Sequence, residues 1–206
     1  MENFEPDFSK ILGKEFYLEP PAEVAKNLLG KILVKKINGK ILAGIIVETE
    51  AYLSHGDESS HSYCGITARN APMFEAGGTI YVYTIYGIHL CVNIVTEGLG
   101  TGSAVLLRAV EPISGIEQMK ISRKTENIFS LCNGPAKLTQ SFGFNIEDNF
   151  KTVFNRNLFV QESLNISENM IVTSKRIGIS KSANLFLRFH INRSPFISIK
   201  NNSKYL

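Results

Sequence analysis

No stretch of this 206-residue sequence approaches the roughly 20 consecutive apolar residues that a membrane-spanning helix requires. The first ten residues, Met1 to Lys10, are polar and acidic and lack the apolar core of a signal peptide, so they do not predict export. A chain of this length with 44% hydrophobic residues can bury one sizeable core. We therefore predict a single domain over residues 1–206, located in the cytoplasm.

Cysteine is scarce, and its pattern is uninformative for cross-linking. Cys64, Cys91 and Cys132 are odd in number, widely spaced and form no Cys-x-x-Cys pair. They predict buried thiols in a reducing compartment, with neither a disulfide framework nor a zinc site. His55 and His61 lie six positions apart, a spacing that matches no common ligand motif, so no metal is predicted.

Acidic residues are absent from Asn169 to the end of the chain, although the net charge of the whole is only +3. A segment whose charged residues are all basic suits a polyanion such as duplex DNA, because neutralising the phosphates supplies affinity that does not depend on the DNA sequence. A solvated basic surface explains the same charge equally well. The seven basic residues of this segment are Lys175, Arg176, Lys181, Arg188, Arg193, Lys200 and Lys204.

Two dipeptides predict β-hairpins. Asn38-Gly39 suits a two-residue type I′ turn between strands at 31–37 and 40–49. Tyr86-Gly87 lies at the tip of a second predicted hairpin, formed by strands at 79–83 and 89–96. Residues 53–78 between the hairpins are polar and predict a long surface loop, a kind of segment that is usually functional or disordered.

The remaining pattern is one of short elements. Phe8, Ile11 and Leu12 have helical spacing, and Pro20-Pro21 precedes a helix that Gly30 closes. Together these elements predict an α+β fold, a single domain with a curved, mostly antiparallel (mixed) β-sheet flanked by short helices. The predicted helices are 22–29, 114–124 (after Pro112) and 136–142, and the further strands are 104–110, 158–160, 170–173, 176–179 and 185–191.

The acidic and aromatic residues that could form a reactive site are concentrated between Val47 and Asn93. Alternate side chains of a strand face the same way, so Glu48, Glu50 and Tyr52 are predicted to share one face at the strand end. Three tyrosines follow around the second turn, and a carboxylate beside aromatic rings can hold a flat heterocycle and activate water. Tyrosines also simply pack well on a pleated surface, and a Glu at a strand end is usually solvated.

Arg108 lies in an apolar predicted strand and therefore needs a partner. The partner is either a carboxylate or the reaction centre. The structural alternative is an ordinary ion pair with Glu111 or another acid. Gly134-Pro135 exposes free backbone N–H groups at the start of a helix with Lys137 in its first turn, which suits a phosphate, although a plain capped helix has the same sequence.

Many short motifs occur in one order over nearly the whole chain. The motifs are Leu28-Leu29-Gly30-Lys31, Val47-Glu48-Thr49-Glu50-Ala51-Tyr52, His61-Ser62, Arg69-Asn70, Met73-Phe74, Tyr81-Val82-Tyr83, Tyr86-Gly87, Asn93, Leu106-Leu107-Arg108-Ala109, Glu111-Pro112, Gly134-Pro135-Ala136-Lys137-Leu138, Arg176-Ile177-Gly178 and Arg193-Ser194-Pro195. In that order they resemble the alkyladenine (3-methyladenine) DNA glycosylase family, the monofunctional base-excision repair glycosylases.

The resemblance implies a role for each matching residue. Glu50 is the general base, and Arg108 and the backbone carbonyl of Ile177 hold the attacking water. Tyr52 on one side, with His61 and Tyr83 on the other, encloses the flipped base, and Tyr86 fills the vacated stack. Asn93 and Leu106 form the part of the pocket that rejects guanine, and the residues implied to contact DNA are Tyr86, Arg69, Lys137, Arg176 and Arg193.

Two departures from the family pattern affect DNA contacts. Ile88 and His89 follow the Tyr86 turn where relatives have other bulky groups, and the loop between His61 and Arg69 is one residue shorter than in some relatives. The shape of the wedge and the contacts of residues 63–68 are therefore not carried over.

The function implied is hydrolysis of the N-glycosidic bond of alkylated or deaminated purines, such as 3-methyladenine, 7-methylguanine, hypoxanthine and ethenoadenine. The partner is double-stranded DNA containing damaged purines, bound by a monomer near the nucleoid of a bacterial cell, with no cofactor. Two alternatives stay open, a non-catalytic damaged-DNA binding protein and a hydrolase of modified bases in RNA. Glu50 together with Arg108 argues against a pure binder, which has no use for a base aimed at water.

Overall fold

The computed structural model describes residues 4–198, and its strands form one curled sheet. The strands are β1 (Ile32–Ile37), β2 (Lys40–Tyr52), β3 (Ile80–Ile85), β4 (His89–Thr96), β5 (Ser103–Ser114), β6 (Phe154–Asn155), β7 (Leu158–Gln161), β8 (Ile171–Ser174) and β9 (Arg188–Ile191). The order is β3-β4-β5-β2-β1-β7-β6, and β9 joins β8 to β2. Each of these pairings is antiparallel, and the α+β prediction is confirmed.

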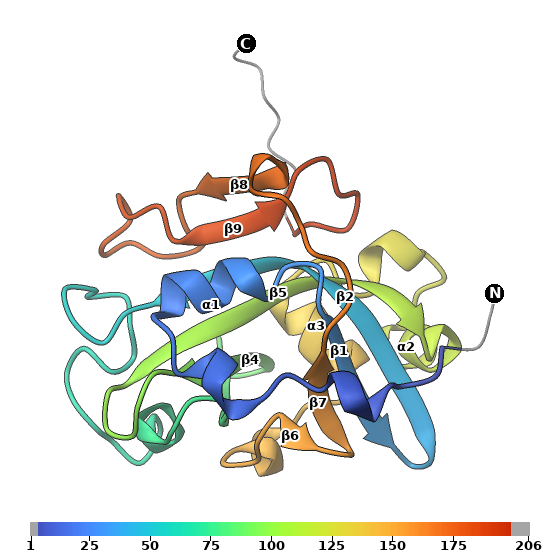
Figure 1. The fold of residues 1–206 in the computed structure, drawn as a ribbon, viewed down its shortest axis with the longest axis horizontal. Helices are drawn as coiled ribbons and strands as arrows, with labels where there is room; N and C mark the ends of the chain where they lie inside the picture. Colours follow the sequence, from blue (N-terminus) through green and yellow to red (C-terminus); the bar gives the residue numbers. More distant parts are fainter. Residues whose placement is uncertain (1–3, 199–206) are drawn as a thin grey trace.

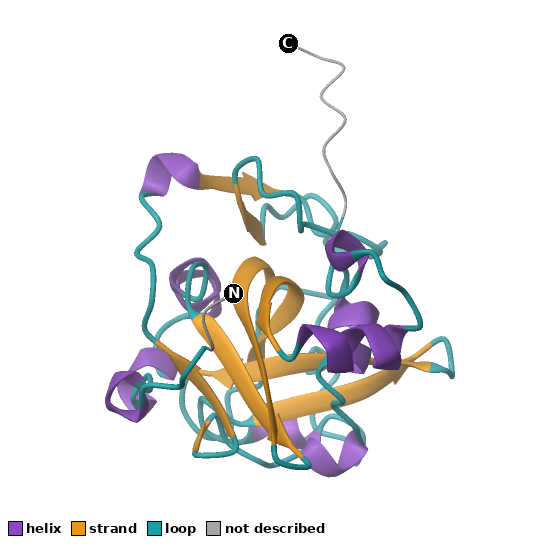
Figure 2. Cartoon of the chain, turned by 90° about the vertical axis from the view of Figure 1, so that its right-hand side faces the viewer, coloured by secondary structure: helices purple, strands orange, loops and turns teal. Residues whose placement is uncertain are grey.

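Short helices surround the sheet (Figure 2). The α-helices are α1 (Pro21–Asn27), α2 (Ile116–Arg123) and α3 (Pro135–Ser141), and the 3-10 helices are η1 (Phe8–Lys10), η2 (Lys14–Tyr17), η3 (Ala71–Phe74), η4 (Ile128–Ser130), η5 (Ile146–Asp148) and η6 (Glu168–Met170). Figure 1 shows α1 over β2 and β5, with β8 and β9 as a short ribbon above them. Within residues 4–198, the helices are all too short or too polar to cross a membrane.

The core follows from alternation along the strands. Leu33 of β1 packs into the main cluster with α1, α3 and the long strands, whereas Ile32 and Val34 belong to a smaller cluster on the opposite face. Because both faces of β1 are covered, the central strands are apolar at nearly every position. This packing fixes the ends of β2 and β5, which carry the polar residues of the site.

Both predicted hairpins are confirmed. Asn38 and Gly39 have φ angles of 49° and 74°, and Tyr86 and Gly87 have φ angles of 53° and 73°. Two consecutive positive φ angles are the signature of a type I′ turn, whose twist matches that of the flanking strands. The second turn projects Tyr86 from the end of the sheet.

Several elements differ from the predictions. Phe8 to Leu12 forms only one 3-10 turn before Leu12 joins the edge of β7 through a bond from its N–H to the carbonyl of Val160, at 2.9 Å. Pro112 does not precede a helix directly, because β5 continues to Ser114 along β2. Residues 176–179 form no strand, and Gly178 has a φ of +78° that an extended strand does not accommodate.

Residues 53–78 were predicted to form a long surface loop, and several of their side chains are buried against the rest of the protein. Asp57, Ser60, Ser62 and Met73 are buried within it. Asn70 is also buried, and its side-chain nitrogen donates to the carbonyls of His61 at 2.7 Å and Gly65 at 2.9 Å. These bonds replace a regular ladder, so the loop has a defined shape beside the site.

Candidate active site

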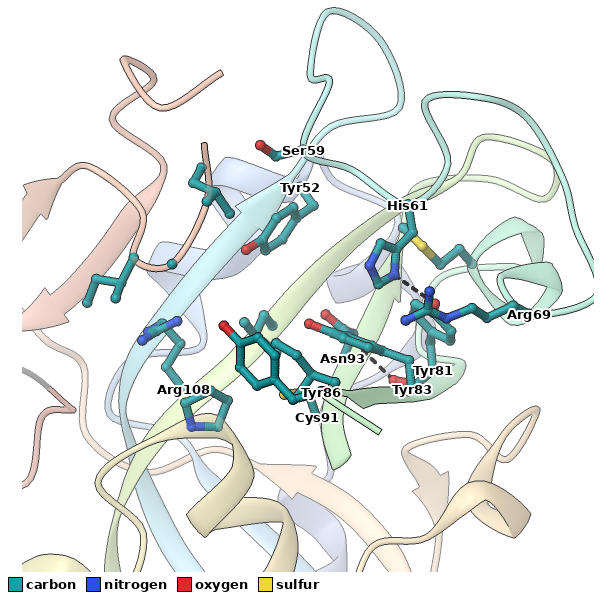
Figure 3. A pocket seen from close by; sticks show the side chains of 17 residues that line it. Tyr52, Ser59, His61, Arg69, Tyr81, Tyr83, Tyr86, Cys91, Asn93 and Arg108 are labelled. Carbon is teal, nitrogen blue, oxygen red and sulfur yellow. Dashed lines mark hydrogen bonds between the residues drawn. The ribbon is translucent and has the colours of Figure 1, made fainter. Parts of the chain in front are cut away.

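A cavity of about 320 Å³ opens where β2, β3, β4 and β5 end, beside residues 59–69 and 177–179. Its size is typical of a pocket for a small organic ligand. Figure 3 shows aromatic side chains gathered around it, with Arg108 on one side and Arg69 on the other. The lining residues are Tyr52, Ser59, His61, Arg69, Met73, Tyr81, Tyr83, Ile85, Tyr86, Cys91, Asn93, Leu106, Arg108, Pro135, Ile177, Gly178 and Ile179.

Glu50 lies behind this lining and is completely buried. It lies within β2, which extends to Tyr52 rather than ending at Thr49 as predicted. One carboxylate oxygen accepts the N–H of Ile177 at 2.8 Å, and the other accepts the Tyr52 hydroxyl at 3.0 Å and Arg108 Nη1 at 3.2 Å. Burial, opposed by the charge of Arg108, raises the pKa of Glu50 above its usual value. A carboxylate held this way can accept a proton.

Arg108 is held between two carboxylates. Its Nε donates to Glu48 Oε1 at 3.0 Å, and its Nη1 donates to Glu50. The partners are therefore the acids of β2 rather than Glu111, and the predicted common face of Glu48, Glu50 and Tyr52 is confirmed by their shared contacts.

Glu48 lies in a different environment from Glu50, because two arginines contact it. Its Oε1 accepts Arg108 Nε at 3.0 Å, Arg188 Nε at 2.7 Å and the Ser198 hydroxyl at 2.8 Å, and its Oε2 accepts the Ser198 N–H at 2.5 Å. Burial opposes ionisation of Glu48, but the charges of Arg108 and Arg188 outweigh it and hold the pKa of Glu48 below its usual value. Glu48 is thus held as the charged partner of two arginines, which makes it a weaker proton acceptor than Glu50.

Aromatic rings form the flat part of the cavity wall. His61 Nδ1 is 2.8 Å from the Tyr81 hydroxyl, and the His61 ring meets the edge of Tyr83 with centroids 4.5 Å apart. Tyr81 and Tyr83 stack at 5.5 Å. Burial, assisted by the nearby charge of Arg69, lowers the pKa of His61, so its imidazole is neutral at pH 7. Tyr52 provides the opposing ring (Figure 3).

The floor of the cavity carries the two residues expected to govern selectivity. Asn93 and Leu106 are both buried and face each other across the β4–β5 pair. The Asn93 side-chain nitrogen donates to the Tyr81 carbonyl at 3.1 Å, which fixes the orientation of its amide. A buried, oriented amide can accept or reject a group at one edge of a ligand.

Comparison with known proteins identifies the group to which this chain is related. The family model described as "Methylpurine-DNA glycosylase (MPG)" matches residues 15–195. The chain belongs to this family. The predicted family resemblance is therefore confirmed.

Three bacterial relatives carry the name "Putative 3-methyladenine DNA glycosylase". The protein of Prosthecochloris aestuarii is 46% identical over 186 residues, which cover 90% of this chain and 89% of the relative. The protein of Francisella tularensis (strain WY96-3418) is 47% identical, covering 86% and 93%. That of Chlorobium phaeobacteroides is 44% identical, covering 94% and 98%. The similarity extends over nearly full length, so this chain is similar to whole DNA glycosylases.

The residues predicted to contact DNA in this methylpurine-DNA glycosylase family member differ in their exposure to solvent. Tyr86 is 81% exposed at the rim of the cavity. Arg69 is also exposed there and donates to the Thr84 carbonyl at 3.0 Å. Arg193 is exposed after β9, and Lys137 is partly buried. Tyr86, Arg69 and Arg193 are thus accessible to a large ligand.

Arg176 is a correction to the predicted DNA contacts. Its side chain is completely buried and forms an ion pair with Asp57, which is equally buried. A guanidinium enclosed in this way cannot reach a phosphate. Arg188 of the predicted basic segment is buried as well. Lys200 and Lys204 of that segment lie outside the described residues.

Sequence reasoning gave no role in the site to Cys91 and Met73, which line the cavity, or to Asp57, which holds Arg176. It included Tyr81 only as one of the three tyrosines around the second turn, and the structure places the Tyr81 hydroxyl 2.8 Å from His61 Nδ1. The alternation of β3 contained the signal for Tyr81, which shares a face with Tyr83. Asp57 carried no such signal, because a loop acid has no periodicity.

The cysteines are only partly as predicted. Cys91 and Cys132 are buried, whereas Cys64 is exposed, and all three are free thiols. Residues 4–198 contain no group of three or more His, Cys, Asp or Glu side chains placed to hold a metal ion.

Proposed function

We propose that this chain is a monofunctional DNA glycosylase that removes alkylated or deaminated purines from duplex DNA and leaves an abasic site. The supporting observation is the position of Glu50, a buried carboxylate with a raised pKa between Arg108 and Tyr52, behind an aromatic-lined cavity. The membership of the methylpurine-DNA glycosylase family supports the reaction class.

Base capture requires that the nucleotide leave the duplex. Extrusion costs a few kcal/mol, and stacking on an aromatic side chain returns roughly 1–3 kcal/mol per base. The rings of Tyr52, His61 and Tyr83 border a cavity in which a purine can lie between them. Tyr86 projects at the rim with 81% of its surface exposed, where its ring can fill the gap left in the stack.

Water activation is assigned to Glu50. A carboxylate has about four lone-pair sites, and three of those on Glu50 already accept hydrogen bonds. The remaining lone-pair site lies on the oxygen that accepts the hydrogen bond from the Ile177 N–H, and it can accept a proton from water. Arg108 holds the carboxylate in place, and the carbonyl of Ile177 remains our predicted second contact to that water.

The chemistry of the departing base explains why few catalytic groups are needed. Alkylation at N3 or N7 gives a purine a positive charge, which weakens its bond to C1′, so orientation of water supplies much of the remaining acceleration. In a neutral lesion such as hypoxanthine the base must gain a proton or a hydrogen bond as it departs. Water is the nucleophile in both cases, so no lysine is required and the strand is not cleaved.

The test is a panel of duplexes that each carry one 3-methyladenine, hypoxanthine or 1,N6-ethenoadenine, with matched RNA strands. After incubation, chromatography measures the free base released from each DNA or RNA substrate, and alkali reveals the abasic sites left in the DNA strands. We expect base release from DNA only. Binding without base release would support a damage-binding protein instead, and base release confined to RNA would support an RNA hydrolase.

A further inference from the structure

Arg176 and Asp57 form an ion pair that the proposed chemistry does not use. Both side chains have 0% exposure, Nη1 lies 2.6 Å from Oδ2, and Nη2 lies 2.7 Å from Oδ1. A buried ion pair gains little net stability, because loss of hydration offsets the attraction between the charges. A bidentate pair does fix geometry, since both groups are planar and rigid.

The pair joins three segments around the site. Asp57 also accepts the N–H groups of Leu53 and Ser59, each at 3.1 Å, which shapes the loop after β2. Arg176 Nη1 donates to the Ala51 carbonyl at 3.0 Å. The end of β2, its following loop and the segment beginning at Arg176 are therefore held together at one point.

Arg176 also supports the ring of Tyr52. Its guanidinium carbon lies 4.6 Å from the Tyr52 ring centroid, within the range of a cation–π contact. Tyr52 lines the cavity, whereas Arg176 is enclosed and does not. The guanidinium thus covers the face of the ring that is turned away from the cavity, while the Tyr52 hydroxyl donates to Glu50 at 3.0 Å.

The residue after Arg176 completes the link to the reacting group. The Ile177 N–H donates to the other oxygen of Glu50 at 2.8 Å. Displacing Arg176 would therefore move both the stacking ring and a donor to the carboxylate. A misplacement of about 1 Å can reduce an enzymatic rate about 100-fold.

We propose that Arg176 and Asp57 are positioning residues that hold Tyr52 as the platform for the extruded base and hold Ile177 against Glu50. Base capture and water activation then depend on the same buried anchor. This inference rests on the proposed function and deepens it, because it assigns both residues to the interior of the site and none of their charge to DNA phosphates.

The test compares Arg176→Lys and Asp57→Asn with Asp148→Asn. Asp148 forms a similarly buried pair with Lys35, with side-chain exposures of 4% and 7%, and neither residue lines the cavity. Three quantities are measured: the single-turnover excision rate, the affinity for lesion and undamaged duplexes, and the dependence of undamaged binding on salt. All are measured below the melting temperature of each variant.

We expect excision to fall about 10- to 100-fold in Arg176→Lys and Asp57→Asn, with weaker preference for lesion over undamaged DNA. Undamaged binding and its salt dependence should not change, and Asp148→Asn should lower only the melting temperature. Full excision by both site variants would overturn the proposal. A salt slope reduced by about one would instead make Arg176 a phosphate contact, and equal rate losses in Asp148→Asn would show a general effect of stability. If the unsubstituted protein releases no base from any lesion, the proposed function itself is wrong, and this outcome is distinct from full excision by the two site variants.

Discussion

The substitution Glu50→Gln tests the assignment of the general base directly. It preserves the size of a side chain that is completely buried, and it replaces an acceptor by a group that cannot take a proton from water. General-base catalysis contributes about 10²- to 10⁴-fold. At about 1.4 kcal/mol per factor of ten, the transition state should lose about 3 to 5 kcal/mol.

The structure also predicts a cost in stability. The carboxylate of Glu50 accepts donors on both oxygens, from Ile177 on one and from Tyr52 and Arg108 on the other. Whichever way the introduced amide is turned, its NH₂ group faces another donor. An unsatisfied buried donor costs about 1–3 kcal/mol, so the melting temperature of the variant should fall.

The assay therefore separates chemistry from folding. Single-turnover excision and lesion-duplex affinity are measured for the parent and Glu50→Gln at a temperature where both are folded. We expect excision to be lost over the stated range while lesion binding survives. Near-parental excision would refute the reasoning. Glu48 would not be the natural replacement, because it is held as the charged partner of two arginines, which makes it a weaker proton acceptor than Glu50.

Three further outcomes follow from the site. Because burial raises the pKa of Glu50 and the ionised form is the active one, excision should decline as the pH falls through a value above 4.5; a rate that stays flat to pH 4.5 in folded protein would contradict this. Tyr86→Ala should reduce excision about ten-fold for a well-paired lesion and less for a mispaired one, with no loss of melting temperature at this exposed position; equal losses would limit Tyr86 to packing of the hairpin tip. Asn93→Ala should gain slow release of guanine opposite a mismatch while keeping most hypoxanthine excision; an unchanged guanine-to-hypoxanthine ratio would leave Asn93 only its bond to the Tyr81 carbonyl.

Local signals account for the elements that were predicted well. Asn38-Gly39 and Tyr86-Gly87 specify their turns because few other residue pairs adopt two positive φ angles in succession. The two-residue alternation of a strand is enough to place Glu48, Glu50 and Tyr52 on one face of β2. The turns and the shared face were therefore predictable from neighbours in the chain.

Boundaries failed where tertiary pairing overrides local preference. Pro112 lacks an N–H and reads as the start of a helix, yet it lies in β5 opposite Gly44, next to a register shift in the β2 ladder. Residues 176–179 include the apolar residues typical of a strand, but they pair with no other strand, since Arg176 turns inward to Asp57.

By itself the sequence determined the two turns, the order of the short elements and the family motifs, because each depends on residues close together in the chain. Only the tertiary structure decided which charges are functional. Arg108 meets Glu48 and Glu50 across some sixty positions, and Arg176 meets Asp57 across 119. Pairs so distant carry no periodic signal, and burial makes their geometry matter. Burial leaves Glu50 able to accept a proton, encloses Glu48 with two arginines, and turns Arg176 from an expected phosphate contact into part of the interior.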